Sequence, residues 1–348
     1  MRIAQVAPLF ESVPPKLYGG TERVVSYLTE ELVNQGHDVT LYASGDSQTR
    51  AKLVSTCNRS LRLAHQNLDH LIFHYLLLEQ LMEEIDDFDL IHFHIDYLHF
   101  PFSRENRLVH LTTLHGRMDL PGLYPLYEKF YDMPVVSISK SQRMPLSWIN
   151  WIDTVYHGLP DTLYKPREET GQYLAFLGRI SPEKRVDRAI EIAKKTGIPL
   201  KIAAKIDEAD EVYFKENIAG LLEDPLIEFI GEITEEEKND FLGNALALVF
   251  PIDWPEPFGL VMIEALACGT PVVAYRNGSV NEILDHGTNG YIVHSIEEAV
   301  DAVNHIHNID RKNCRKTFEE RFTAKIMASN YLRLYEKINK YHITQKVY

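Results

Sequence analysis

Residues 251–271 have the sequence PIDWPEPFGLVMIEALACGTP, which predicts the end of a strand, a loop and a helix in immediate succession. The preceding run, Ala245–Phe250, is apolar throughout, which is typical of a strand buried inside a parallel sheet. Leu260–Cys268 is then predicted to be a helix that ends at Gly269. Because a buried strand followed by a loop and a helix is the repeating unit of parallel sheets, this stretch indicates fold class α/β.

The same alternation continues on both sides of this stretch and divides into two blocks. Residues 158–171, between the blocks, combine glycines, prolines and mixed charges, a composition typical of a linker. Two such blocks predict two Rossmann-like domains facing each other across a cleft, with ligands at the carboxyl ends of the strands. The expected strands are 3–7, 39–43, 90–94, 108–114, 135–138, 154–156, 173–177, 200–204, 227–230, 245–250, 272–275 and 291–293, and the expected helices are 21–35, 68–85, 186–196, 209–222, 235–243, 260–268, 296–306 and 323–340.

The composition is that of an acidic globular protein, with 348 residues, 45% of them hydrophobic, and a formal net charge of −14. The basic residues form no tract of the kind that holds a nucleic-acid backbone, so we expect no nucleic-acid partner. One concentration of basic residues could face an anionic acceptor or make peripheral contact with a membrane, or could be ordinary solvated charge. It consists of Arg104, Arg107, Arg117, Lys129, Lys140 and Arg143.

Several sequence signals are missing, and each absence narrows the function. The three cysteines are widely spaced, so they predict neither a disulfide framework nor a zinc or iron–sulfur site. No apolar run approaches the roughly 18–20 residues that span a bilayer, and the N-terminal run reaches Pro8 and Glu11 too early for a signal peptide, so we expect a cytoplasmic protein. The sequence has no GxGxxG after the first strand and no GxxxxGK[ST], which argues against an NAD enzyme or a P-loop ATPase.

Two basic residues follow the strand expected at 173–177. Arg179 comes directly after Gly178, and Lys184 follows a Ser-Pro-Glu sequence that is typical of a helix start. A guanidinium fork and an ammonium beside a helix start suit a pyrophosphate, although a charged surface loop would have the same composition. A glycine pair, Gly19-Gly20, stands at another expected helix start, where it either lets a ligand approach the backbone or simply makes a turn.

Two carboxylates distinguish residues 251–271. Glu256 lies between two prolines, which hold its backbone extended, and Glu264 interrupts an otherwise apolar helix, where it needs a partner. About 9 Å of helix separates Phe258 from Glu264. Two acids that far apart could hold the two ends of a sugar nucleotide, and the alternative for Glu264 is a structural role as a cap or a salt-bridge partner.

A group of histidines stands near the end of a strand in the first block. His92, His94 and Asp96 alternate along the chain and so share one face of the strand. This spacing fits metal ligands, polar residues that line a cleft, or core histidines with satisfied hydrogen bonds. His110 and His115, at or beyond the next strand, could join them.

Together these segments resemble the retaining glycosyltransferases with the GT-B fold, in particular family four (glycosyltransferase group 1). The resemblance covers nearly the whole chain, and its strongest part is EPFGLVMIEA at residues 256–265, an E-x7-E pattern. The supporting segments are Tyr18-Gly19-Gly20, Ile91–His94, Thr113–Gly116, Gly178-Arg179 with Lys184, and Gly231-Glu232-Ile233.

The resemblance implies a role for each matching residue. Arg179 and Lys184 would hold the donor pyrophosphate and neutralise the leaving group, and Glu256 would contact the hydroxyls of the donor sugar. His115 would lie near the reacting face of the sugar, so these four are the candidate catalytic residues. The candidate donor-binding residues are Glu264 at the ribose hydroxyls, Ile233 at the base, Phe258, Gly259 and Leu260 against the sugar and phosphates, and Gly19 and Gly20 near the phosphate and the acceptor.

The resemblance also implies a domain plan and a reaction. Residues 1–165 would form an acceptor-side domain, with a helix at about 325–348 packing back on it, and residues 166–324 would bind the nucleotide sugar.

A hexose would move from a nucleoside diphosphate sugar, with UDP-glucose expected first and GDP-mannose second, by same-face displacement that needs no metal and no cofactor. The acceptor (a saccharide, a lipid-linked molecule or a small molecule), the linkage and the oligomeric state stay open.

Two other functions compete with this one. A sugar-nucleotide epimerase or hydrolase on the same scaffold would need an additional acid–base pair, for which His92, His94 and Asp96 are the candidates. A non-catalytic sensor of sugar nucleotides would be expected to have lost Arg179, Lys184 or Glu256. All three residues are present, which counts against a sensor.

Overall fold

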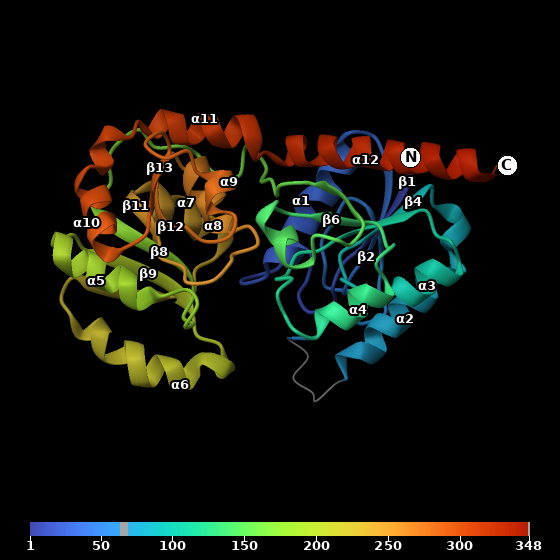
Figure 1. The fold of residues 1–348 in the computed structure, drawn as a ribbon, viewed down its shortest axis with the longest axis horizontal. Coiled ribbons are helices and arrows are strands. Elements are labelled where there is room, and N and C mark those ends of the chain that lie inside the picture. Colours follow the sequence, from blue (N-terminus) through green and yellow to red (C-terminus); the bar gives the residue numbers. More distant parts are fainter. Residues whose placement is uncertain (63–68, 347–348) are drawn as a thin grey trace. The chain divides into compact units, whose positions relative to one another are not determined.

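Two parallel β-sheets form the framework of the computed structural model, which describes residues 1–62 and 69–346 (Figure 1). One sheet belongs to unit 1, which comprises residues 1–158 and the chain from Ala324 onward, and the other belongs to unit 2, Leu159–Thr323. The first residue of the helix expected at 68–85 and the last two residues of the helix expected at 325–348 lie outside the described residues.

Within the described residues, the sheet of unit 1 has seven strands in the order β3-β2-β1-β4-β5-β6-β7. All pairings are parallel, so the carboxyl ends of the strands share one edge. The strands β4 and β5 are buried along their whole length, as expected where helices cover both faces of a sheet. The strands are β1 (Arg2–Val6), β2 (Asp38–Tyr42), β3 (Lys52–Val54), β4 (Leu90–Phe93), β5 (His110–Thr113), β6 (Val135–Ser137) and β7 (Trp151–Thr154), and the helices are α1 (Gly20–Asn34), α2 (His70–Glu83), α3 (Phe100–Glu105), α4 (Leu123–Lys129) and α12 (Ala324–Lys346).

Residues 159–323, all of which the structure describes, contain a six-stranded parallel sheet with the order β10-β9-β8-β11-β12-β13. The direction of winding reverses between β8 and β11, and ligands of doubly wound sheets bind at such a reversal. The helix α5 packs against α10, and α8 packs against α7 and α11 (Figure 1). The strands are β8 (Tyr173–Arg179), β9 (Leu200–Lys205), β10 (Ile227–Gly231), β11 (Ala245–Phe250), β12 (Val272–Tyr275) and β13 (Gly290–Val293), and the helices are α5 (Val186–Thr196), α6 (Glu211–Tyr213), α7 (Glu235–Gly243), α8 (Leu260–Ala267), α9 (Val280–Ile283), α10 (Ile296–Asn304) and α11 (Arg311–Arg321).

Two expected elements differ in the structure. The helix expected at 209–222 is interrupted, because α6 continues into a π-helical turn, Phe214–Ile218, and then a 3-10 turn, Ala219–Glu223, which contains the poor helix former Gly220. The strand expected at 154–156 lies earlier in the chain, at Trp151–Thr154, because these are the residues that pair with β6.

The boundary between the units lies after Gly158 and not after residue 165. Leu159 donates its N–H to the carbonyl of Phe322 at 2.9 Å, so the chain joins unit 2 at once. The helix α12 packs against α1 and buries Tyr335 in unit 1. Among residues 1–62 and 69–346, no helix combines the length and the apolar composition that crossing a membrane requires.

Candidate active site

Lys184 and Glu256 meet where the neighbouring strands β8 and β11 give way to loops. The Lys184 ammonium forms an ion pair with the Glu256 carboxylate, and the two side chains are 16% and 11% exposed. The rings of Trp254 and Phe250 flank the ammonium, with centroids 5.0 and 5.7 Å from Nζ. Trp254 also donates from Nε1 to Oε2 of Glu256 at 2.9 Å. Two residues predicted to be catalytic are therefore paired in partly desolvated surroundings. Trp254 contacts both of them, although no sequence pattern singled it out.

Arg179, the last residue of β8, lies among three carboxylates. Its guanidinium is 2.9 Å from Glu183, 3.2 Å from Asp207 and 3.6 Å from Asp210. Burial works against ionisation of Asp207, but hydrogen bonds from Lys205 and Arg179 lower its pKa. Burial raises the pKa of Asp210. A phosphate that binds Arg179 would have to compete with these carboxylates, which the sequence pattern did not indicate.

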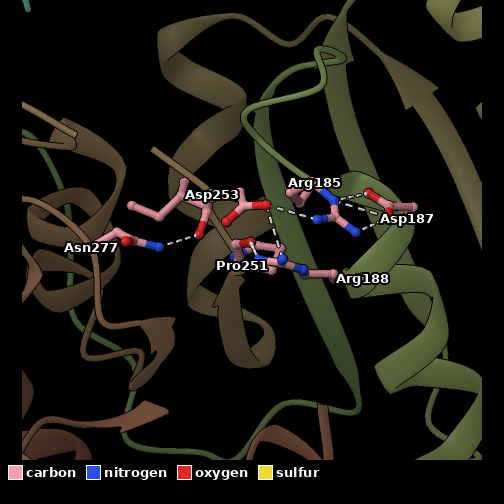
Figure 2. Close-up of polar contacts among 7 residues, drawn as sticks. Arg185, Asp187, Arg188, Pro251, Asp253 and Asn277 are labelled. Atoms are coloured by element: carbon pink, nitrogen blue, oxygen red, sulfur yellow. Dashed lines mark hydrogen bonds and ion pairs between the residues drawn. The ribbon is translucent and has the colours of Figure 1, made fainter. Parts of the chain in front are cut away.

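An ionic cluster ties the loop after β11 to the first turn of α5 (Figure 2). Asp253 accepts hydrogen bonds from Arg185 at 2.9 Å and from Arg188 at 3.0 Å. The N–H of Asp253 donates to the Glu183 carbonyl at 2.8 Å, and Asn277 donates to the carbonyl just before Asp253 at 2.8 Å. Arg185 has a φ of 54°, a strained left-handed conformation for a residue other than glycine. The cluster fixes the two backbone segments from which the Lys184–Glu256 pair projects.

A tight turn at residues 277–279 fixes the backbone of Glu256. The N–H of Ser279 donates to the Glu256 carbonyl at 3.0 Å, and its hydroxyl donates to the Phe258 carbonyl at 2.6 Å. Gly278 has a φ of +56°, and a Cβ at this position would lie 2.2 Å from the Glu256 carbonyl oxygen. Only glycine fits at this position. In the sequence, the turn-forming Asn-Gly-Ser at residues 277–279 was the one signal that could have indicated a tight turn here.

Glu264 has a salt-bridge partner in the structure. Gly259 precedes α8 with a φ of +79°, and a Cβ there would lie 2.8 Å from the end of the Met262 side chain. Glu264, on α8, is 3% exposed and pairs with Lys238 of α7 at 2.8 Å. Lys238 also pairs with Glu235 at 3.2 Å. Lys238 therefore supplies the partner that a buried carboxylate needs, and no pattern in the acidic run around Lys238 marked it as that partner.

The other predicted donor-binding residues stand at strand ends or helix starts. Ile233 is half-buried between β10 and α7, Phe258 is buried, and Leu260 begins α8. In unit 1, Gly20 is the first residue of α1, and a Cβ on the preceding Gly19 would lie 2.7 Å from a side-chain atom of Pro15. These positions belong to the edge where ligands bind in parallel sheets.

His115 follows β5 and contacts a row of buried histidines in unit 1. Its Nε2 is 2.9 Å from Nδ1 of His94, and its ring stacks on that of His157 with centroids 5.2 Å apart. Burial lowers the pKa of His115 to about 3. Both ring nitrogens of His92 and of His94 have hydrogen-bond partners, and these residues are at most 2% exposed. Of the three alternatives, the satisfied core histidine describes His92 and His94; within the described residues, no group of three or more His, Cys, Asp or Glu is placed to hold a metal ion.

Part of the basic concentration at residues 104–143 is paired locally. Arg104 forms an ion pair with Asp132, and Arg117 forms one with Asp119 at 2.6 Å. These arginines are surface charges with acidic neighbours, which favours the solvated-charge interpretation of the concentration.

Comparisons with known proteins give consistent results for the whole chain. The model of the family described as Glycosyl transferases group 1 matches residues 164–321, and the model described as Glycosyltransferase Family 4 matches residues 18–184. N-acetyl-alpha-D-glucosaminyl L-malate synthase of Bacillus anthracis is 22% identical over 365 residues, which cover 91% of this chain and 93% of that protein. Sucrose-phosphate synthase of Thermosynechococcus elongatus has a TM-score of 0.77 at 18% identity, covering 97% of this chain and 99% of that one. HepE of Anabaena, solved in complex with UDP and glucose, has a TM-score of 0.77 at 17% identity, covering 97% of this chain and 100% of that one.

Proposed function

The chain belongs to the group 1, family 4 glycosyltransferases and has their GT-B fold, and from this premise we propose that it transfers glucose from UDP-glucose to an acceptor hydroxyl with retention of configuration. The enzyme is a glycosyltransferase that uses a nucleotide sugar. The observation that carries the finer proposal is the Lys184–Glu256 pair, which sets a cation and an acid side by side at the reversal between β8 and β11.

In the proposed mechanism, the main task of the protein is to stabilise the charge of the departing diphosphate. Arg179 and Lys184 supply fixed positive charge in a partly desolvated place, where such charge acts more strongly than in water. The start of α8 adds the positive end of a helix dipole, and Gly259 supplies the left-handed backbone conformation from which this helix begins. Glu256 accepts hydrogen bonds from hydroxyls of the sugar, and Glu264 does so from the ribose.

Retention follows if the acceptor attacks from the face that the diphosphate leaves. The bond between the anomeric carbon and the phosphate oxygen breaks, a bond from the acceptor oxygen to that carbon forms, and the acceptor proton passes to the departing phosphate. His115 would lie near the reacting face as a neutral imidazole, because its pKa is lowered by burial. Proton transfer through the leaving group requires no metal ion and no cofactor.

The preference for UDP-glucose is supported by the Anabaena neighbour that was solved with UDP and glucose. GDP-mannose is the second candidate donor, and the acceptor is a saccharide, a lipid-linked molecule or a small molecule. An epimerase or hydrolase is disfavoured, because two of its three candidate acid–base residues, His92 and His94, use both ring nitrogens in internal hydrogen bonds, which leaves Asp96 alone.

Calorimetric titration with UDP, GDP and ADP tests the proposal, followed by turnover assays with the corresponding sugars. We expect UDP to bind, and Lys184→Ala and Arg179→Ala each to lower kcat by about 10²–10³-fold with an unchanged circular dichroism spectrum. Lys194→Ala is the matched control, since Lys194 is half exposed and pairs with Asp224 on the surface. EDTA should leave turnover unchanged. Absence of binding by any nucleoside diphosphate, or normal turnover in both active-site variants, would contradict the proposal.

A further inference from the structure

The two groups that the proposed function assigns to different parts of the donor neutralise each other in this structure. Lys184 is assigned to the diphosphate and Glu256 to the sugar, yet their side chains form an ion pair. A carboxylate is an oxyanion, as a phosphate is, and it satisfies an ammonium in the same way. The position that a diphosphate oxygen would take on Lys184 is therefore filled by a group of the protein itself.

The surroundings make this pair more than a surface contact. The two side chains are 16% and 11% exposed, and the Lys184 ammonium lies 5.0 Å from the ring centroid of Trp254 and 5.7 Å from that of Phe250. Charges in such surroundings lose part of their hydration, so either partner alone would be costly. Glu256 also accepts from Trp254 at 2.9 Å, and this hydrogen bond orients the carboxylate toward the ammonium.

The backbone on both sides of the pair is fixed independently of it. The cluster of Asp253 with Arg185 and Arg188 joins the two loops (Figure 2), and the N–H of Ser279 donates to the Glu256 carbonyl at 3.0 Å. An exchange of partners at Lys184 therefore requires side-chain rotations rather than movement of either loop.

We propose that Glu256 is an internal competitor for the diphosphate: it occupies Lys184 until the donor binds, and the diphosphate displaces it. The released carboxylate then accepts hydrogen bonds from hydroxyls of the hexose. Recognition of the sugar thereby depends on the diphosphate, and a free hexose finds Glu256 already engaged. The inference rests on the proposed function in one respect, since it takes Lys184 as a ligand of the diphosphate.

A double-mutant cycle with UDP, which lacks the sugar, tests this exchange. We expect Glu256→Gln to tighten UDP binding about tenfold by calorimetry, because it removes the charge that competes for Lys184. Lys184→Ala should weaken UDP binding, and adding Glu256→Gln to Lys184→Ala should give no tightening. Glu236→Gln, at an exposed position of α7, is the matched control for loss of a negative charge.

Trp254 provides an optical measurement of the same exchange. In a background with Trp148 and Trp151 replaced by phenylalanine, its fluorescence should change when UDP binds, because its N–H loses the Glu256 acceptor, and should change little when glucose alone is added. The inference is overturned if folded Glu256→Gln binds UDP no more tightly than the unsubstituted chain while Lys184→Ala loses binding. A tightening that persists in the Lys184→Ala background also overturns it, since the effect would then be long-range charge. If Lys184→Ala binds UDP normally, the proposed function fails as well.

Discussion

The contacts of Lys238 predict that its replacement costs more stability than replacement of Glu264, the partner it holds. Lys238→Met removes the cation from two acids at once, Glu264 at 2.8 Å and Glu235 at 3.2 Å. Because the Glu264 side chain is only 5% exposed, it would keep a charge that has lost its partner, and breaking a buried pair in this way costs about 3–5 kcal/mol. Glu264→Gln keeps an oxygen that accepts from Lys238, which also keeps Glu235, so the cost should be about 1 kcal/mol.

Urea unfolding at neutral pH, followed by circular dichroism, measures both free energies. Lys215→Met is the matched control: Lys215 pairs with Glu211 on the surface, where both side chains are more than half exposed, and such a pair contributes at most about 1 kcal/mol. Equal losses for Lys238→Met and Glu264→Gln, or a loss for Lys238→Met no larger than the control, would refute the reasoning from burial. UDP affinity separates the two roles of Glu264, because a pure salt-bridge partner would leave it unchanged in Glu264→Gln, whereas a ribose ligand would not.

Three further predictions follow from the same structure. Gly278→Ala should abolish most turnover, because the new Cβ would lie 2.2 Å from the Glu256 carbonyl oxygen. The control is Gly287→Ala, where φ is +80° but a Cβ would have no atom within 4 Å, so it should cost about 1 kcal/mol of stability and leave turnover unchanged. Similar kinetics for the two variants would contradict this prediction. Arg311→Met should lower the free energy of unfolding by about 3 kcal/mol in urea titration, since the buried guanidinium donates to three carbonyls and one hydroxyl at 2.7–2.9 Å; a loss below 1 kcal/mol would show that these hydrogen bonds matter little. Burial lowers the pKa of six histidines well below 6.5, so the folded chain binds fewer protons than the unfolded chain once the pH falls below about 6.5. Stability should therefore decrease as the pH falls from 7 to 5, by at most about 1.4 kcal/mol per pH unit for a histidine that stays neutral in the folded chain; a urea midpoint that stays constant over this range would refute this. The six are His92, His94, His99, His110, His115 and His157.

The fold and most of its strands were predictable because they are encoded in short stretches, whereas β3 and the helices α3, α4, α9 and α11 were not among the expected elements. Ala245–Phe250 is apolar without interruption and is a buried strand, and Leu260–Ala267, which ends just before Gly269, is a helix. These signals need only the neighbours of each residue along the chain. The helix expected at 209–222 failed where local preference was weak, at Gly220 and in the π-helical turn before it.

The contacts that give the candidate site its character were not predictable in this way. Lys184 and Glu256 are 72 residues apart, and Lys238 and Glu264 are 26 apart, so each pair depends on which strands lie beside each other. The sequence left three interpretations of His92 open, and only the hydrogen bonds made by both of its ring nitrogens decided among them. Residue type and spacing determine which groups leave the end of a strand, whereas the burial and pairing of those groups depend on the order of the strands and on loop packing, which no local pattern contains.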